Sequence, residues 1–149
     1  MTRIVFLAML ILVACDRTDT RRATCPSIEV SVVADMPSDS NRSVALSDGK
    51  RVFLAAPPLV TSADVTGAHA SLTEGQYVLK VDVTAEAATR VRVFSEQNVG
   101  RQMAFLVDGR LVRTPTIKDP ITKNGFLIGA FARAEAESLA NALNSDCRP

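Results

Sequence analysis

The fold is decided by one stretch of sequence, Asn98-Val99-Gly100-Arg101-Gln102-Met103-Ala104-Phe105-Leu106-Val107-Asp108-Gly109-Arg110-Leu111-Val112-Arg113-Thr114-Pro115. Its opening Asn-Val-Gly suits the end of a helix, because glycine adopts the left-handed backbone conformation without steric cost. The apolar run from Met103 to Val107 predicts a strand, and Asp108-Gly109 is favoured in a two-residue type I′ turn. The stretch therefore predicts a helix end that leads directly into a β-hairpin.

Patterns on both sides of this hairpin predict the rest of the fold. Alternating or continuous apolar residues predict strands over 28–33, 43–46, 51–54, 68–72, 76–83 and 125–129, with turn signals at Asp48-Gly49 and Glu74-Gly75. Helices are predicted from the N-cap Thr84 to about Gln97 and over 132–144, each with an apolar stripe. We predict an α+β fold: an antiparallel sheet built of hairpins, with two helices packed on one face.

The first residues predict a bacterial lipoprotein signal. Arg3 supplies a positive start, and residues 4–13 form an apolar segment that is too short to span a bilayer. The following Ala14-Cys15 resembles a lipobox, in which the cysteine is acylated and the peptide is cut before it. An ordinary secretory signal with a chance cysteine is the alternative. We predict a signal peptide over 1–14 and lipidation of Cys15 with two or three acyl chains, which anchor stably.

Residues 15–26 are predicted to form the lipidated cysteine and a short polar tether, and residues 27–149 a single domain. Asp16, directly after the cysteine, resembles the inner-membrane retention signal of enterobacterial lipoproteins. We therefore expect the domain to face the periplasm close to the membrane, with the inner membrane favoured. No later apolar stretch is long enough to span a bilayer.

Two further cysteines, Cys25 and Cys147, lie near the ends of the predicted domain. Disulfides persist in an oxidising compartment, so we predict a bond between them. Two free thiols or a metal site are the alternatives. No histidine lies near either cysteine, and their spacing matches no zinc pattern. We predict no metal and no cofactor.

The composition narrows the range of partners. The chain has 149 residues, enough for a substantial core, and a formal net charge of +1. A balanced charge argues against nucleic acid, which requires a basic face. No glycine-rich phosphate loop is present, because Asn98 to Arg101 lacks the necessary glycines and lysine. We expect no small-molecule substrate.

Candidate catalytic side chains are few. His69 is the only histidine and lies in a predicted strand, so a structural role is favoured over that of a general base. Asp108 is explained by its turn, and Glu135 with Glu137 by a solvated helix face. Arg90 and Arg92 lie at helical spacing from Glu86 and Glu96, which favours surface ion pairs. We predict no catalytic residue and no enzymatic activity.

With these residues stated, the segment from about Val52 to Ser145 resembles the head subdomain of the first periplasmic domain of SecD, in the SecDF protein-export complex. The resemblance rests on matches in chain order, which are Asn98-Val99-Gly100-Arg101, Ala104 to Gly109, Leu111 to Ile117, Ile121 to Phe131 and Ala134 to Leu143. It implies structural roles for Asn98, Gly100, Arg101, Asp108, Gly109, Pro115, Gly125 and Gly129.

The sequence also departs from that family. Ala132 replaces the usual Ser or Thr N-cap of the last helix, which weakens that helix start by about 1 kcal/mol. The membrane-spanning helices and proton-relay residues of SecD have no counterpart, so the resemblance implies at most a binding role. The family match does not clearly explain residues 28–53.

Two functional hypotheses follow. The first is a non-enzymatic envelope lipoprotein that binds exported polypeptide or an envelope protein partner, in association with protein export, through strand addition at an exposed sheet edge. The alternative is a structural or regulatory envelope scaffold unrelated to export, whose interactions depend on Ile28 to Phe53.

Overall fold

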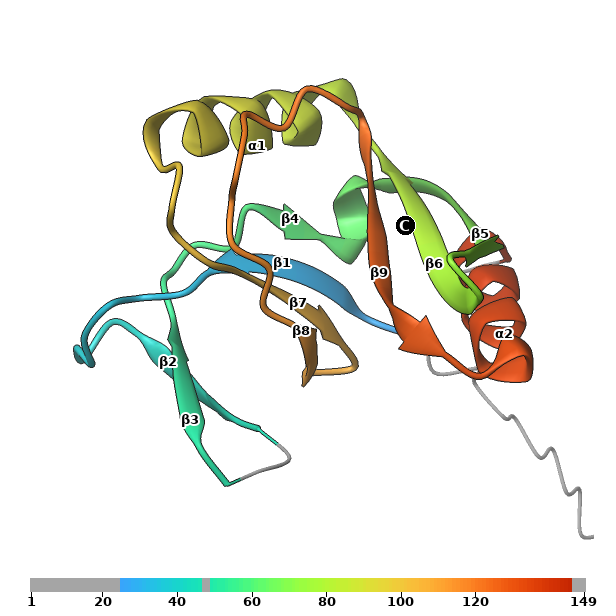
Figure 1. The fold of residues 1–149 in the computed structure, drawn as a ribbon, viewed down its shortest axis with the longest axis horizontal. Helices are drawn as coiled ribbons and strands as arrows, with labels where there is room; N and C mark the ends of the chain where they lie inside the picture. Colours follow the sequence, from blue (N-terminus) through green and yellow to red (C-terminus); the bar gives the residue numbers. More distant parts are fainter. Residues whose placement is uncertain (1–24, 47–48, 146–149) are drawn as a thin grey trace, which may run out of the picture.

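The computed structural model describes residues 25–46 and 49–145 (Figure 1). Its helices and strands follow the chain in the order β1 (Ile28–Val32), β2 (Arg42–Ala45), β3 (Arg51–Leu54), β4 (Val60–Thr61), η1 (Ser62–Asp64), β5 (Val65–Thr73), β6 (Gln76–Val83), α1 (Ala85–Gln97), β7 (Met103–Val107), β8 (Arg110–Arg113), β9 (Gly125–Phe131) and α2 (Arg133–Asn144).

The strands form antiparallel sheets, and the α+β class is confirmed. One sheet has the order β4-β1-β7-β8, a second has the order β5-β6-β9, and β2 pairs only with β3. The structure thus divides the predicted sheet into three. Within the first sheet, β1 occupies an inner position between β4 and β7 and does not pair with its sequence neighbour β2.

The main core lies where the two larger sheets face each other. Val30 and Phe105 from the first sheet meet Leu79, Val81 and Ile128 from the second, and all are buried. The rings of Phe105 and Phe126 contact each other edge to face across the core, with centroids 5.6 Å apart. Burial of both inner faces is what holds the sheets together.

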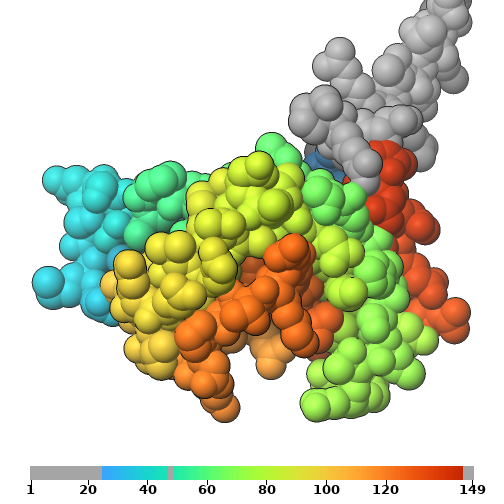
Figure 2. Space-filling view, turned by 90° about the horizontal axis from the view of Figure 1, so that it is seen from above, coloured from blue at the N-terminus to red at the C-terminus, as the bar shows by residue number. Residues whose placement is uncertain are grey.

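The two helices reach this core from different sides. Helix α1 lies across the top of the molecule in Figure 1 and inserts Ala87, Ala88 and Val91 into the core. Helix α2 packs against β5 and β6 and contributes Ala140 and Leu143. Figure 2, seen from above, shows α1 between the β2–β3 hairpin and the β5–β6 hairpin.

The β2–β3 hairpin covers the outer face of the first sheet. Leu54 is buried there against Ala104 and Leu106 of β7, with Val44 and Val52 packed around them. Strand β1 is buried along most of its length. Strand β1 and the strands β2 and β3 therefore belong to the packed body of the domain, because they supply an inner strand and the cover of one sheet face.

Local signals in the sequence are confirmed where the backbone depends on near neighbours. The Thr84 hydroxyl accepts a hydrogen bond from the Ala87 N–H and caps α1, whereas Ala132 at the start of α2 provides no side-chain cap. Asp108 and Gly109 have φ of +50° and +72°, as a type I′ turn requires. The predicted connection over 59–64 is more ordered than expected, because it contains β4 and η1.

Candidate functional site: an apolar groove between two arginines

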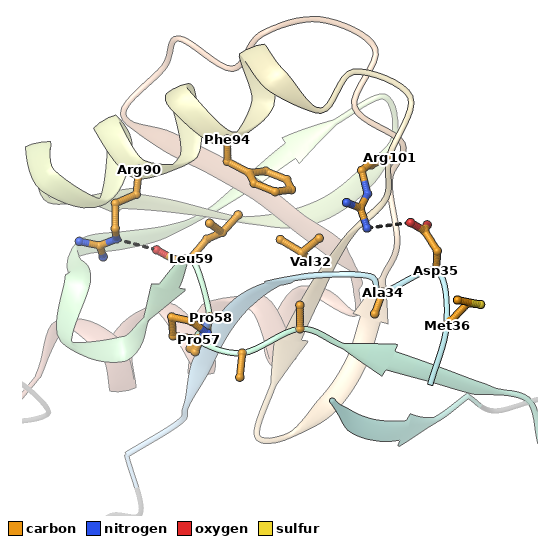
Figure 3. A pocket seen from close by; sticks show the side chains of 12 residues that line it. Val32, Ala34, Asp35, Met36, Pro57, Pro58, Leu59, Arg90, Phe94 and Arg101 are labelled. Atoms are coloured by element: carbon orange, nitrogen blue, oxygen red, sulfur yellow. Dashed lines mark hydrogen bonds and ion pairs between the residues drawn. The ribbon is translucent and has the colours of Figure 1, made fainter. Parts of the chain in front are cut away.

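A groove opens beside α1, on the side of the molecule that carries the end of β1 (Figure 3). Its volume is about 580 Å³. Most of its lining is apolar, and an arginine lies at each end in Figure 3. The groove is defined here by Val32, Ala34, Asp35, Met36, Ala55, Ala56, Pro57, Pro58, Leu59, Arg90, Phe94 and Arg101.

Backbone hydrogen bonds fix the walls of the groove. The Ala34 N–H donates to the Phe53 carbonyl at 2.8 Å, and the Ala55 N–H donates to the Val32 carbonyl at 2.9 Å. The Leu59 N–H donates to the Val30 carbonyl at 2.8 Å. These bonds hold the 55–59 connection, with its cis Ala56-Pro57 peptide bond, along the end of β1. Segments far apart in the sequence thereby form one wall.

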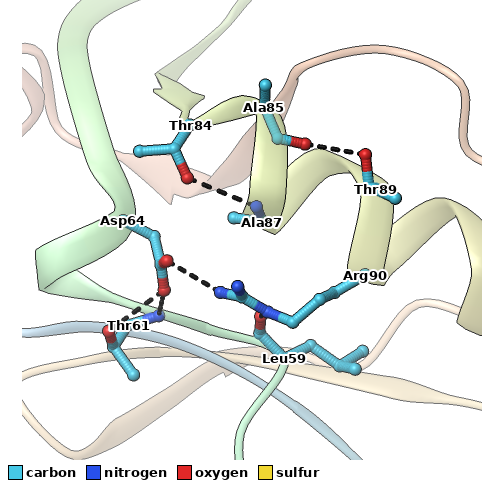
Figure 4. A network of polar contacts seen from close by, with 8 residues as sticks. All are labelled: Leu59, Thr61, Asp64, Thr84, Ala85, Ala87, Thr89 and Arg90. Carbon is cyan, nitrogen blue, oxygen red and sulfur yellow. Dashed lines mark hydrogen bonds and ion pairs between the residues drawn. The ribbon is translucent and has the colours of Figure 1, made fainter.

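At one end of the groove, Arg90 is held by a network of polar contacts (Figure 4). Its Nη2 donates to Asp64 Oδ1 at 2.7 Å, and its Nε donates to the Leu59 carbonyl at 3.1 Å. Asp64 Oδ2 accepts from the Thr61 N–H at 2.9 Å and from the Thr61 hydroxyl at 3.1 Å. This network ties α1 to β4 and η1.

The environment of Asp64 stabilises its charged form. Burial would by itself raise the pKa of this carboxyl, because a low dielectric disfavours charge. The hydrogen bonds from the Thr61 backbone, the Arg90 guanidinium and the Thr61 hydroxyl outweigh burial and hold the pKa below its usual value. Asp64 and Arg90 therefore act as a fixed structural pair.

At the other end, Arg101 faces the groove from the loop between α1 and β7. Its Nη2 lies 3.0 Å from Asp35 Oδ2 and 3.4 Å from the Val33 carbonyl oxygen. Its Nε is buried and has no hydrogen-bond partner among the described residues. Asp35 is 81% exposed, so this ion pair faces solvent.

Two sequence interpretations change at this site. Arg90 was predicted to form a surface ion pair along its own helix, but it pairs with Asp64 from another segment. Helical spacing could not reveal this partner, because Asp64 approaches only through the packing of η1. Arg101 was assigned a purely structural role, and its side chain lines the groove. The Asn-Val-Gly-Arg motif identified the residue but not its exposure to the groove.

The other residues of the predicted structural motif lie at turns and close contacts. Asn98 ends α1 and donates from Nδ2 to the Phe94 carbonyl, and Gly100 has a φ of +92°. The Asp108 carboxylate accepts from the Ser27 N–H. The Pro115 carbonyl accepts from the Met103 N–H.

Two glycines of that motif lie in β9. At Gly125 a Cβ atom would approach the Val81 carbonyl oxygen to 2.6 Å. At Gly129, where φ is +69°, a Cβ atom would lie 2.7 Å from Val112 and from the Phe131 ring. A side chain at either position would displace neighbouring atoms, so both glycines permit close packing.

The cysteines fall largely outside this description. Cys25 is exposed at the start of the described chain, and Cys15 and Cys147 lie outside the described residues. Lipidation of Cys15 and the Cys25–Cys147 bond stay predictions.

Candidate catalytic residues are dispersed over the surface. His69 is exposed on β5 and lies opposite Lys80 of β6. Glu137 accepts from Arg133 Nε at 2.7 Å, one turn earlier in α2, and Glu135 is exposed. Within residues 25–46 and 49–145, no group of three or more potential metal ligands is found. No helix in the same residues is long and apolar enough to cross a membrane.

The fold and groove define an α+β domain with an apolar surface site, and comparison with known proteins gives its family. The family model "SecDF, P1 head subdomain" matches residues 37–147. The chain belongs to this family. The match begins at residue 37, so the β2–β3 hairpin, which sequence inspection left unexplained, lies within the family region.

Curated relatives are longer proteins. The chain is 30% identical over 135 residues to the protein translocase subunit SecD of Aquifex aeolicus, which covers 83% of this chain and 27% of that protein. It is 33% identical over 95 residues to SecDF of Thermus thermophilus, covering 62% of this chain and 13% of that protein. The chain thus spans about a quarter or less of these two relatives.

Solved structures show the same fold. A structure of "a membrane component SecDF that enhances protein export" superposes with a TM-score of 0.62 at 22% identity, covering 80% of this chain and 62% of that one. SecDF in its "Super-membrane-facing form" superposes with a TM-score of 0.63 at 22% identity, covering 80% of this chain and 18% of that one.

Proposed function

We propose that this chain is a non-enzymatic lipoprotein of the bacterial envelope that binds exported polypeptide, in association with protein export. The observation that carries the proposal is the apolar groove beside α1 in a domain of the SecDF P1 head family. Exported chains are unfolded, and they present the apolar side chains that a folded protein buries. The same surface could accept an unfolded segment of an envelope protein partner.

The groove supports binding better than the edge of β5 does. Strand addition needs free backbone groups along an edge strand. At Ala68, near the middle of β5, the N–H donates to Asn144 Oδ1 at 2.9 Å, and Asn144 Nδ2 donates to the Ala68 carbonyl. The side chain of Asn144 therefore occupies that edge as a neighbouring strand would. We place the polypeptide in the groove for this reason.

Site-specific photo-crosslinking tests the proposed function. A photoreactive residue replaces Met36, which lines the groove and is 75% exposed, and a control protein carries it at Leu72, which is 61% exposed and is not part of the lining. Each purified protein is mixed with a permanently unfolded model polypeptide or with its folded form. We expect cross-linking from position 36 to the unfolded chain only. Equal cross-linking from both positions would argue against a site in the groove.

The membrane anchor is proposed from the sequence. Cys15 follows a short apolar segment, and acylation there would place the domain within reach of the membrane through a tether of about 30 Å when fully extended. Labelling with radioactive palmitate should mark the wild-type chain and not the Cys15→Ala variant. Fractionation of the labelled protein tests the inner-membrane location that Asp16 suggests.

The Cys25–Cys147 bond is also proposed. Figures 1 and 2 place the start of the described chain on the same side of the molecule as α2, the last described helix. This arrangement is compatible with a bond between the two ends of the domain. Mass spectrometry of the non-reduced, proteolysed protein should find a peptide pair joined through these residues, and alkylation of both thiols without reductant would contradict it.

The absence of enzymatic activity is part of the proposal. His69 lies apart from the groove lining, so replacement by alanine should leave binding of the unfolded polypeptide unchanged. A hydrolytic activity that depends on His69 would contradict it. The scaffold hypothesis remains the alternative. Deleting Ile28 to Phe53 would not test it, because β1 is an inner strand of the four-stranded sheet and its removal would disrupt the fold.

A further inference from the structure

We propose that the groove selects apolar segments that carry a carboxylate, and that this carboxylate replaces Asp35 on the Arg101 guanidinium. The inference rests on the proposed function and names the class of polypeptide that the groove prefers. The carboxylate belongs to an acidic side chain within the segment, because a polypeptide lying along the groove offers internal side chains throughout its length but only one C-terminal carboxylate. Preference for a free chain end is the competing outcome of the experiment below.

The first support is that Asp35 holds Arg101 weakly. Asp35 is 81% exposed and lies on the segment that follows β1, with Arg101 as the single ion-pair partner found for it among the described residues. Exposed pairs of this kind contribute little free energy, because both charges are well hydrated when apart. An incoming carboxylate can therefore take the place of Asp35 at small cost.

The second support is that Arg101 itself is fixed in place. Its N–H donates to the Asn98 carbonyl at 3.1 Å, and its carbonyl accepts from the Ile117 N–H at 2.8 Å. The neighbouring Gly100 N–H donates to the Ile117 carbonyl at 2.8 Å. A guanidinium on an ordered backbone loses little freedom when it binds a ligand, and its planar fork suits a carboxylate.

The third support is the unused hydrogen-bonding capacity of Arg101. A guanidinium has five N–H donors. The described residues supply acceptors only to Nη2, and the buried Nε has none. A small rotation that brings Nε and an Nη atom to one carboxylate would satisfy this buried donor, whereas the present single contact with Asp35 does not.

The position of Arg101 defines the ligand. Figure 3 shows Arg101 and Asp35 at one end of the groove, with Val32, Leu59 and Phe94 between them and Arg90. A bound segment would place its carboxylate at Arg101 and its apolar side chains along this lining. Arg90 offers no second carboxylate site, because Asp64 and the Leu59 carbonyl already occupy it.

The test uses short apolar peptides that differ only in charge. One has an internal glutamate and an amidated end, one has glutamine at that position and an amidated end, and one has glutamine and a free carboxylate end. Binding to the full-length protein is measured by fluorescence anisotropy at low salt. We expect the internal-glutamate peptide to bind the wild type about tenfold more tightly than the neutral peptide. Tighter binding of the free-end peptide alone would overturn the assignment to an acidic side chain.

Variants assign the preference to Arg101. Arg101→Gln should bring the affinity for the charged peptide down to that for the neutral one, and Arg101→Lys should keep part of the preference. Asp35→Asn removes the competing carboxylate and should tighten binding of the charged peptide a few-fold. Arg133→Gln is the matched control, since Arg133 also pairs with a carboxylate but lies outside the groove, and it should leave the preference unchanged.

Each outcome decides between the proposals. If charged and neutral peptides bind the wild type equally, the selection for a carboxylate is wrong and the proposed function stands. If no peptide binds, the proposed function fails as well. If Arg101→Gln does not fold, Asp35→Asn still decides, because tightening of the charged peptide alone is expected and an unchanged ratio would overturn the inference.

Discussion

Arg90–Asp64 and Arg101–Asp35 are two arginine–aspartate pairs at opposite ends of one groove. Their N–O distances are similar, but the exposure and the hydrogen bonding of the two aspartates differ. Their N–O separations are 2.7 Å and 3.0 Å. The Asp64 side chain is 18% exposed and accepts three different donors, whereas the Asp35 side chain is 81% exposed and meets Arg101 alone among the described residues. The two ion pairs therefore have similar N–O distances but differ in exposure and in the number of hydrogen bonds to the aspartate.

The comparison of the two pairs indicates which charges hold the domain together and which are available to a partner. Hydrogen bonds to a partly buried carboxylate are lost only at the cost of leaving charged groups unsatisfied. An exposed pair exchanges readily with water or with another ion. We therefore expect Arg90 to keep Asp64 as its partner, and Arg101 to exchange Asp35 for the carboxylate of a ligand.

The largest expected effect is on stability. Asp64→Ala should lower the free energy of unfolding by about 2 kcal/mol, because the Thr61 N–H and the Arg90 guanidinium lose their acceptor. Asp35→Ala should change it by less than about 0.5 kcal/mol. Urea unfolding followed by circular dichroism measures both, and similar losses in the two variants would abolish the distinction between the pairs.

The apolar lining between the arginines should account for most of the binding. Phe94→Ala should weaken charged and neutral peptides alike by about tenfold, since it removes apolar contact area without changing charge. Val93→Ala, on the exposed side of the same helix, is the control. Anisotropy measured well below the melting temperature of each variant gives the affinities. A loss confined to charged peptides would assign the binding to charge instead.

Acid should weaken the domain through Asp64. Its pKa is lowered in the folded state, so its contribution is complete above the ordinary pKa of an aspartate and is lost as pH falls through the lower folded value. The stability difference between wild type and Asp64→Asn should thus shrink below about pH 4. Unfolding curves from pH 3 to 7 test this, and a constant difference would contradict the role given to this carboxylate.

Salt should produce the smallest effect and act at the exposed end. Raising sodium chloride from 0.05 to 0.5 M should reduce the preference for charged peptides a few-fold, because screening acts most strongly on exposed charges. The stability contributed by Arg90–Asp64 should change less. The peptide affinities and the unfolding free energies of Asp64→Ala and wild type are compared at both concentrations. A salt-independent preference would place the carboxylate away from Arg101.

Much of the local structure could be predicted from short stretches. The Thr84 cap, the left-handed Gly100 and the Asp108-Gly109 turn depend on backbone conformations that only near neighbours influence. The family resemblance also followed from short stretches, among them the helix end at Asn98 to Arg101 and the Asp108-Gly109 turn, and the family model confirms it. The short strand β4 was missed, because its pairing partner β1 lies about 30 residues earlier in the chain, and the short helix η1 that follows β4 was missed with it.

The sequence by itself determined the α+β class, the hairpins, the helix boundaries and the family of this protein, because periodicity, turns and caps are local properties of the chain. Only the tertiary structure decided that β1 lies between β4 and β7, that Arg90 pairs with Asp64 and that Arg101 lines a groove. The groove combines residues from 32–36, 55–59 and 90–101, which tertiary packing and long-range hydrogen bonds bring together. The same packing sets the exposure of each aspartate, and exposure decides which arginine a ligand can reach.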